Sequence, residues 1–193
     1  MSLTPRYADD RRRGGWLRKY FPDKLQQLPA HIRPPLTFIF IGPKGACSKL
    51  HSDVWHTSAW LAQLQGRKHF TFFHPDHTRL VHNETHGWAD PAKGVAAHRE
   101  THKYYHAAQP FTATISPGDI IFIPSKWSHQ VTSLDHAVSV TSNYIDQSNI
   151  KSCLMPFTKY LEQRKMTMRM LSMISKILKS AKDNNDEEDE DSD

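Results

Sequence analysis

The chain is poor in cysteine and has no long apolar run. Its two cysteines, Cys47 and Cys153, lie far apart and outside any C-x-x-C pattern. This spacing indicates neither a disulfide framework nor a zinc knuckle, so we expect a protein of a reducing compartment. No apolar stretch approaches the length of a membrane span, and the first ten residues lack the apolar core of a secretion signal. We therefore expect no membrane association and a nuclear or cytoplasmic location.

Charge is distributed unevenly along the 193 residues. The formal net charge is +5, but residues 183–193 hold eight acids and no base, so the charge of the remaining chain rises by eight to +13. A body this basic favours acidic partners such as nucleic acid or chromatin, although an ordinary solvated surface explains the charge equally well. The acidic residues 183–193 have the composition of a disordered tail.

The chain length fits one domain with tails. Residues 1–35 are polar and basic, and we interpret them as a lead-in segment that contains Arg11–Arg13 and a short helix ending at Pro29. Residues 36–146 carry the signals of a β domain, and residues 147–182 those of helices.

Short apolar runs separated by Gly, Pro and Asp turn residues predict an all-β core, a sandwich or jelly roll. We also expect the segments on either side of Asp135 to form an antiparallel hairpin, which would place Thr141 opposite His129. The main expected strands lie at residues 36–43, 59–65, 68–75, 111–115, 119–124 and 137–144.

A polar insertion occupies about residues 74–109 and contains seven of the thirteen histidines. His98, His102 and His106 follow helical spacing, and a loop of this length is often a lid or a binding element. No carboxylate or cysteine stands at ligand spacing, so we interpret the segment as a histidine-rich surface loop and not as a second metal site.

Apolar residues recur with helical periodicity after Tyr144 and predict a packing stripe. The stripe either covers the β core or pairs with a second subunit, which would give a homodimer through the C-terminal helices. Its members are Leu154, Phe157, Leu161, Met170, Leu171, Ile174, Ile177 and Leu178.

Three residues suggest a metal site. His51 and Asp53 stand two positions apart on a strand-like segment, so their side chains share one face. His129, in P-S-K-W-S-H-Q-V, is expected at the start of another strand. Together they make the 2-His-1-carboxylate set that holds Fe(II) and leaves positions open for substrate and O₂. We therefore predict oxygen chemistry.

Lys68 starts an otherwise apolar strand just after a turn at Gly66. In a barrel interior its ammonium group would need an anion, and a dicarboxylate bound to the metal would provide one. The alternative is an exposed hairpin lysine. The hydroxyl of Thr141, on the same face as His129 in the expected hairpin, suits the binding of an acidic co-substrate.

The motifs G-P-K-G, H-S-D, T-S-A-W, Q-G-R-K, P-G-D, P-S-K-W-S-H and T-S-N-Y follow one another within residues 36–146. In this order they resemble the JmjC and cupin-like Fe(II)/2-oxoglutarate oxygenases, especially the branch of the bifunctional arginine demethylase and lysyl hydroxylase. The resemblance implies a double-stranded β-helix (jelly roll, cupin) with flanking helices, including a C-terminal helical segment.

The resemblance also implies residue roles. His51, Asp53 and His129 would be the iron ligands, Lys68 would pair with the distal carboxylate of 2-oxoglutarate, and Thr141 would donate a hydrogen bond to that carboxylate.

Further roles follow from the same resemblance. Tyr7 would reach the co-substrate from an earlier strand, Asn143 would lie near the metal, and Ser48 would lie in the co-substrate pocket. Where the family carries an asparagine after S-A-W, this chain has Leu61, so one polar contact is missing. The chain also begins close to Tyr7, and we expect either a minimal form or a truncated one.

We expect a 2-oxoglutarate-dependent dioxygenase that hydroxylates a lysine, arginine or similar side chain of a protein or peptide and releases succinate and CO₂. Demethylation of an N-methyl group by the same chemistry is the alternative. Two further hypotheses are a catalytically weak binding module and a cupin isomerase or dioxygenase acting on a small molecule. A Lys68 that faces solvent would favour the small-molecule enzyme.

Overall fold

The computed structural model describes residues 23–27 and 34–163, together with residues 172 and 176. Residues 35–143 form one compact unit, and residues 1–34 with 144–193 form the other. Within the described residues, no helix is both long enough and apolar enough to span a membrane.

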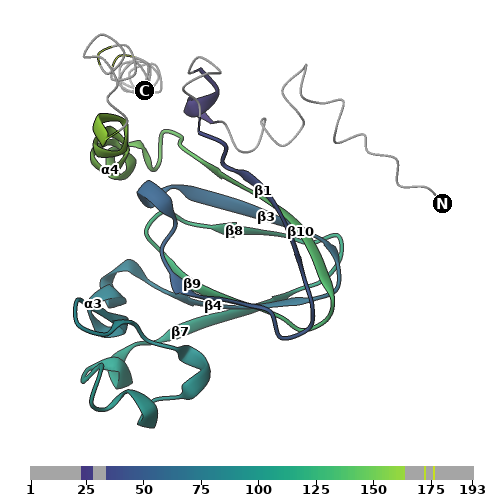
Figure 1. Cartoon of the computed structure of the whole chain (residues 1–193), viewed down its shortest axis with the longest axis vertical. Coiled ribbons are helices and arrows are strands. Elements are labelled where there is room, and N and C mark those ends of the chain that lie inside the picture. Colours follow the sequence, from purple (N-terminus) through teal and green to yellow (C-terminus); the bar gives the residue numbers. More distant parts are fainter. Residues whose placement is uncertain (1–22, 28–33, 164–171, 173–175, 177–193) are drawn as a thin grey trace, which may run out of the picture. The chain divides into compact units, whose positions relative to one another are not determined.

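Two four-stranded sheets form the centre of the unit of residues 35–143, which also contains a two-stranded sheet in its insertion (Figure 1). The strand order is β1-β10-β3-β8 in the first sheet and β2-β9-β4-β7 in the second. Along the chain, β1 to β4 and then β7 to β10 alternate between the sheets, which confirms the predicted jelly roll. The strands are β1 (Thr37–Gly42), β2 (Cys47–His51), β3 (Ser58–Gln65), β4 (Lys68–Phe73), β7 (Pro110–Ile115), β8 (Ile120–Ile123), β9 (Ser128–Ser133) and β10 (Ala137–Tyr144).

The core lies between the inner faces of the two sheets. Side chains alternate along each strand, so every second residue points inward. On β4 the inner residues are Lys68, Phe70 and Phe72, and all three are buried. The apolar cluster at the centre is formed by Ala59, Leu61, Phe70, Phe72, Ile115 and Ile123.

Gly66 allows the tight connection between β3 and β4. Its φ is +68°, in the left-handed region, and a Cβ at this position would collide with the carbonyl oxygen of His136. Arg67 next to it holds the facing loop through Asp135, with Nε of Arg67 2.8 Å from the carboxylate. The start of β4, and with it Lys68, is fixed by this corner.

The predicted hairpin between β9 and β10 is wrong. β9 pairs with β2 and β4, whereas β10 pairs with β1 and lies beside β3 in the other sheet. The short connection around Asp135 therefore crosses between the sheets. Thr141 pairs with Phe38, and His129 pairs with His51 and Phe72.

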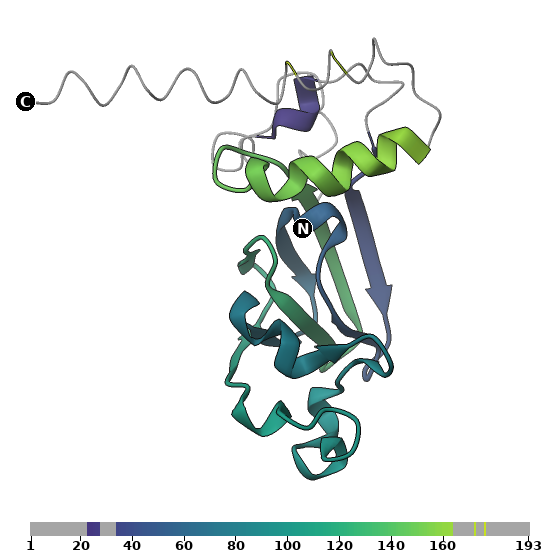
Figure 2. The same ribbon diagram turned by 90° about the vertical axis from the view of Figure 1, so that its left-hand side faces the viewer.

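The insertion between β4 and β7 packs against one part of the outer face of the second sheet and shares an apolar cluster with it. Its Val81, Ala89 and Tyr105 cluster with Leu50 and Phe73 of that sheet. Figure 2 shows the insertion, in teal, at the lower end of the view. Its elements are η4 (Pro75–His77), α3 (Thr78–Val81), β5 (His82–Asn83), β6 (Gly87–Trp88), η5 (Pro91–Lys93), η6 (Ala96–His98) and η7 (Tyr105–Ala107).

Two histidines of the insertion are buried, which corrects our interpretation of a surface loop. Nε2 of His98 lies 2.8 Å from the carbonyl oxygen of Asp90, and Nε2 of His102 lies 2.9 Å from that of Gly87. A carbonyl oxygen only accepts, so both rings donate. They satisfy backbone groups inside the insertion.

The second unit contains η2 (Lys24–Gln27) and α4 (Ile150–Gln163), the latter within the segment where we expected helices. Asp23 joins the two parts of its chain, because its Oδ1 accepts the N–H groups of Leu25 and Ile145. Several predictions concern positions outside the described residues. These are Tyr7, Arg11–Arg13, the helix end at Pro29, the apolar positions between 170 and 178, and residues 183–193.

Candidate metal centre

β2 and β9 bring the three predicted ligands together. β2 ends at His51, so Asp53 lies just beyond the strand, at the start of η3 (Val54–His56). Its backbone is still extended (φ −62°, ψ 154°), which keeps the spacing of a strand. His129 is the second residue of β9 and pairs directly with His51.

The candidate ligand atoms of His51, Asp53 and His129 all lie within 4.8 Å of one another. Oδ1 of Asp53 is 3.8 Å from Nε2 of His51 and 3.9 Å from Nε2 of His129. These distances are too long for hydrogen bonds, so the three atoms surround a common point without binding one another. In the part of the chain that the structure describes, no other cluster of three His, Cys, Asp or Glu side chains has this geometry.

Backbone contacts orient both histidines so that Nε2 of each ring faces the Asp53 carboxylate. Nδ1 of His51 lies 2.7 Å from the carbonyl oxygen of Lys49, and Nδ1 of His129 lies 3.3 Å from that of Trp127. Because these oxygens can only accept, each Nδ1 carries the hydrogen. Burial lowers the pKa of His129, and nearby His51 adds to the decrease, against the opposing attraction of Asp53. A neutral imidazole is the form that binds a metal.

Asp53 supplies an independent indication of a missing partner. Its Oδ2 is buried and has no hydrogen-bond partner among the described residues. A buried carboxylate oxygen left unpaired is costly, and a bound cation would remove that cost. The donor set of two imidazoles and one carboxylate fits Fe(II).

The turn of residues 53–57, here called the ligand turn, is strained and braced. Trp55 and His56 adopt left-handed conformations (φ +51° and +59°), which non-glycine residues rarely do. Asn143 donates to the hydroxyl of Thr57 (3.0 Å), and that hydroxyl donates to the carbonyl of Val54 (2.9 Å).

A second brace joins the ligand turn to the loop that precedes His129. The hydroxyl of Ser125 donates to the carbonyl of His56 over 2.6 Å. Neither Thr57 nor Ser125 was among the predicted site residues. Thr57 belongs to the T-S-A-W motif and Ser125 to P-S-K-W-S-H, so their place within the motifs was the available signal.

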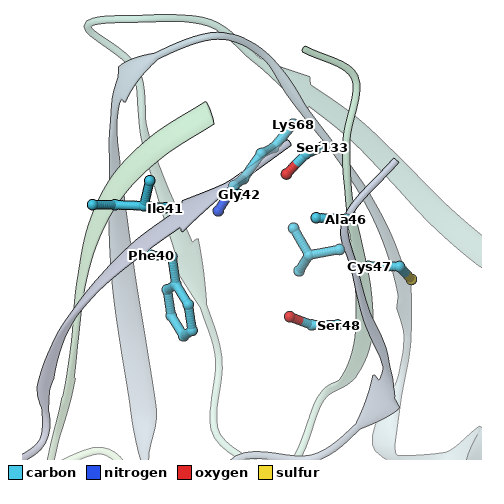
Figure 3. A pocket seen from close by; sticks show the side chains of 9 residues that line it. Phe40, Ile41, Gly42, Ala46, Cys47, Ser48, Lys68 and Ser133 are labelled. Atoms are coloured by element: carbon cyan, nitrogen blue, oxygen red, sulfur yellow. The ribbon is translucent and has the colours of Figure 1, made fainter. Parts of the chain in front are cut away.

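Lys68 lies in a cavity of about 120 Å³ between the sheets (Figure 3). Its side chain reaches toward Gly42 and Phe40, the Ser48 hydroxyl points in from β2, and the Cys47 sulfur points away. Nζ of Lys68 is 5.3 Å from the centre of the Phe40 ring. The full lining is Phe40, Ile41, Gly42, Ala46, Cys47, Ser48, Lys68, Val131 and Ser133.

The Lys68 ammonium group has no anionic partner among the residues described. The residue is only 6% exposed, and burial lowers its pKa below the ordinary value. Lys68 pairs with Ser133 and Phe72 pairs with His129, so the cavity and the metal centre lie four residues apart on one inner face. That spacing corresponds to roughly 13 Å between Cα positions along the strand.

The structure places the remaining candidates as follows. Thr141 is buried on β10, and its hydroxyl donates to the carbonyl of Trp60 (2.7 Å). Asn143 is buried two residues further and contacts Thr57, as described above. Leu61 belongs to the apolar cluster, so it adds no polar contact. Tyr7 lies outside the described residues.

Comparisons with known proteins agree with this geometry. Residues 5–150 match the family described as "Cupin-like domain". The "2-oxoglutarate and iron-dependent oxygenase JMJD4" of Danio rerio is 33% identical over 120 residues, which cover 58% of this chain and 27% of that protein.

Two further relatives carry the names of demethylating or hydroxylating enzymes. The "Arginine-specific demethylase JMJ22" of Arabidopsis thaliana is 31% identical over 70% of this chain and 28% of its own length. The "Bifunctional arginine demethylase and lysyl-hydroxylase psr-1" of Caenorhabditis elegans is 29% identical over 68% of this chain and 35% of its own length. The chain thus spans about a quarter to a third of the length of these relatives.

Proposed function

Because this chain belongs to the JmjC and cupin-like family, we propose that it is an Fe(II)- and 2-oxoglutarate-dependent dioxygenase that hydroxylates a side chain of a protein substrate. One observation carries the proposal: a His51, Asp53 and His129 set shares one inner face with a buried lysine that lacks an anion among the described residues. The first feature suits iron and the second suits a dicarboxylate.

Each of the three residues would contribute a ligand to the iron. His51 and His129 would offer their Nε2 atoms, which their backbone contacts orient, and Asp53 would offer its carboxylate, whose Oδ1 lies within 4 Å of both Nε2 atoms. When bound, iron with 2-oxoglutarate and O₂ supplies the oxidising power for C–H hydroxylation, with release of succinate and CO₂. The apolar side chains of Phe70 and Phe72 exclude water from the face between Lys68 and the ligands.

Lys68 would hold the distal carboxylate of 2-oxoglutarate. Burial disfavours its charged form, and a carboxylate in the cavity would restore it. Ser48 lines the same cavity and offers a second donor. For Thr141 to join them, its hydroxyl must release the carbonyl of Trp60, because one hydroxyl donates one hydrogen.

The substrate class rests on the relatives, whose names specify lysine and arginine residues. We favour hydroxylation of a lysine or arginine side chain. Hydroxylation of an N-methyl carbon would instead lead to demethylation by the same site. The proposal includes a nuclear or cytoplasmic location, which the low cysteine content and the lack of any C-x-x-C pattern support.

The deciding experiment measures succinate. Purified protein is incubated under air with Fe(II), ascorbate and 2-oxoglutarate, beside a His51→Ala/Asp53→Ala double variant. We expect slow, substrate-independent succinate formation by the parent protein and none by the variant. Iron binding without succinate would contradict the co-substrate and favour a small-molecule cupin. A protein that binds no iron would contradict the enzyme altogether and favour a binding module.

A further inference from the structure

A row of inner-face side chains leads from the metal centre across the second sheet. Directly paired residues of neighbouring strands point to the same face. His51 pairs with His129, His129 with Phe72, and Phe72 with Phe111. The row crosses β2, β9, β4 and β7 and ends on the outermost strand of this sheet (Figure 1).

The row ends in an aromatic cluster, here called the aromatic wall, of the exposed Phe111 and His74 and the half-buried Trp127. The ring centres of Phe111 and Trp127 are 5.6 Å apart, and those of Trp127 and His74 are 5.2 Å apart at nearly right angles. Phe111 is 56% exposed, although its partner Phe72 is buried. Exposed aromatic side chains next to a candidate metal centre are typical of a binding surface.

The aromatic wall is linked to the metal centre in two ways. One is the row of paired residues, and the other is the short backbone segment between Trp127 and His129. Trp127 stands two residues before His129, and its carbonyl oxygen accepts the hydrogen bond from Nδ1 of His129. Trp127 also packs against the central apolar cluster. Phe111 therefore lies on the same inner face as His51 and His129, on the opposite edge strand of the sheet.

Asp76 gives the wall a negative charge. Its carboxylate lies 3.3 Å from Nδ1 of His74, and the backbone N–H of Asp76 donates to the same nitrogen. Both contacts hold Asp76 next to His74 of the wall. Among the described residues, no lysine or arginine forms an ion pair with Asp76, whose side chain is 85% exposed.

We propose that the aromatic wall and Asp76 form the subsite that receives a lysine or arginine side chain of the protein substrate. The inference rests on the proposed function and adds the residues that would recognise the substrate. Aromatic faces attract cations and pack against the aliphatic stems of these side chains. The carboxylate of Asp76 attracts the same charged group. A neutral side chain of equal size would gain only the packing.

The test compares charged side chains with neutral ones of the same shape. The full chain, loaded with Mn(II) and 2-oxoglutarate under nitrogen, is applied to peptide pools with randomised flanks and a central Lys, Arg, norleucine or citrulline. We expect Lys and Arg pools to be retained about fivefold more than their neutral counterparts. Phe111→Leu, which keeps an apolar side chain without the aromatic face, and Asp76→Asn should each reduce this preference.

Phe122→Leu is the matched control, because Phe122 is similarly exposed (47%) on the edge strand of the other sheet. It should keep the preference. Equal retention of charged and neutral pools, retention of none, or a preference that survives in Phe111→Leu and Asp76→Asn would overturn the inference. The wild-type succinate assay judges the proposed function separately. Succinate without a preference for cations would refute the subsite alone, and absence of succinate would refute the proposed function.

Discussion

At the scale of single residues, Lys68 combines a stability cost with a binding role. Burial lowers its pKa, so between the folded and unfolded pKa values the unfolded chain binds more protons. The free energy of unfolding must therefore rise as pH increases through this window toward the ordinary value of 10.5. Lys68→Met should remove that dependence, leave the ligand-free protein at least as stable at pH 7, and weaken 2-oxoglutarate binding by about tenfold or more.

Urea unfolding between pH 7 and pH 10, and calorimetric titration of 2-oxoglutarate into Mn(II)-loaded protein, measure the two effects of the Lys68 substitution. Lys93→Met serves as the control, because Lys93 is an exposed lysine of the same charge. A Lys68→Met protein that is less stable at neutral pH would show that the ammonium group already has a partner in the ligand-free fold.

Thr57 should position Asp53 through the ligand turn. Thr57→Val keeps the shape of the side chain but leaves Nδ2 of the buried Asn143 without an acceptor and frees the strained turn. We expect the affinity for Co(II), followed by its visible absorption, to fall about tenfold to a hundredfold. The free energy of unfolding should fall by about 1–3 kcal/mol.

Thr57→Ser is the rescue variant, since it restores the hydroxyl. Thr71→Val, on the partly exposed outer face of β4, controls for loss of a threonine hydroxyl. If Thr57→Val is less stable but binds Co(II) with unchanged affinity, the role of Thr57 is purely structural.

At the scale of elements, the β3–β4 corner depends on Gly66. Gly66 and Gly87 share a φ of +68°, but a Cβ at Gly87 would meet nothing within 4 Å, whereas one at Gly66 would meet the carbonyl of His136. Gly87→Ala should cost only the left-handed strain, about 1–2 kcal/mol. Gly66→Ala should cost clearly more and should also weaken 2-oxoglutarate binding, because the corner sets the start of β4. If urea unfolding shows that Gly66→Ala and Gly87→Ala lose the same free energy of unfolding, the corner can rearrange around the added Cβ without further cost.

A strand was predictable where the residue pattern within that strand is enough to identify it. The alternation in residues 68–73 and the Gly and Pro punctuation gave the strands, and the two-residue spacing of His51 and Asp53 gave a shared face. Pairing between strands was not predictable in the same way, because the connection around Asp135 is short enough for a hairpin but crosses to the other sheet. The burial of His98 and His102 was also hidden, since it depends on carbonyl groups supplied by a distant part of the insertion.

At the scale of the whole molecule, metal binding should act on folding itself. The unfolded chain cannot hold His51, Asp53 and His129 together, so a metal that binds the folded state stabilises it by mass action, by about 2.7 kcal/mol at a free concentration one hundred times the Kd. We expect Mn(II) to raise the thermal midpoint and EDTA to reverse the rise.

The His51→Ala/Asp53→Ala variant should not respond. Its metal-free midpoint should be close to or above that of the parent, because the substitution also removes the unpaired, buried Oδ2 of Asp53. A parent midpoint insensitive to Mn(II) in differential scanning calorimetry would show that the three side chains do not form a metal site.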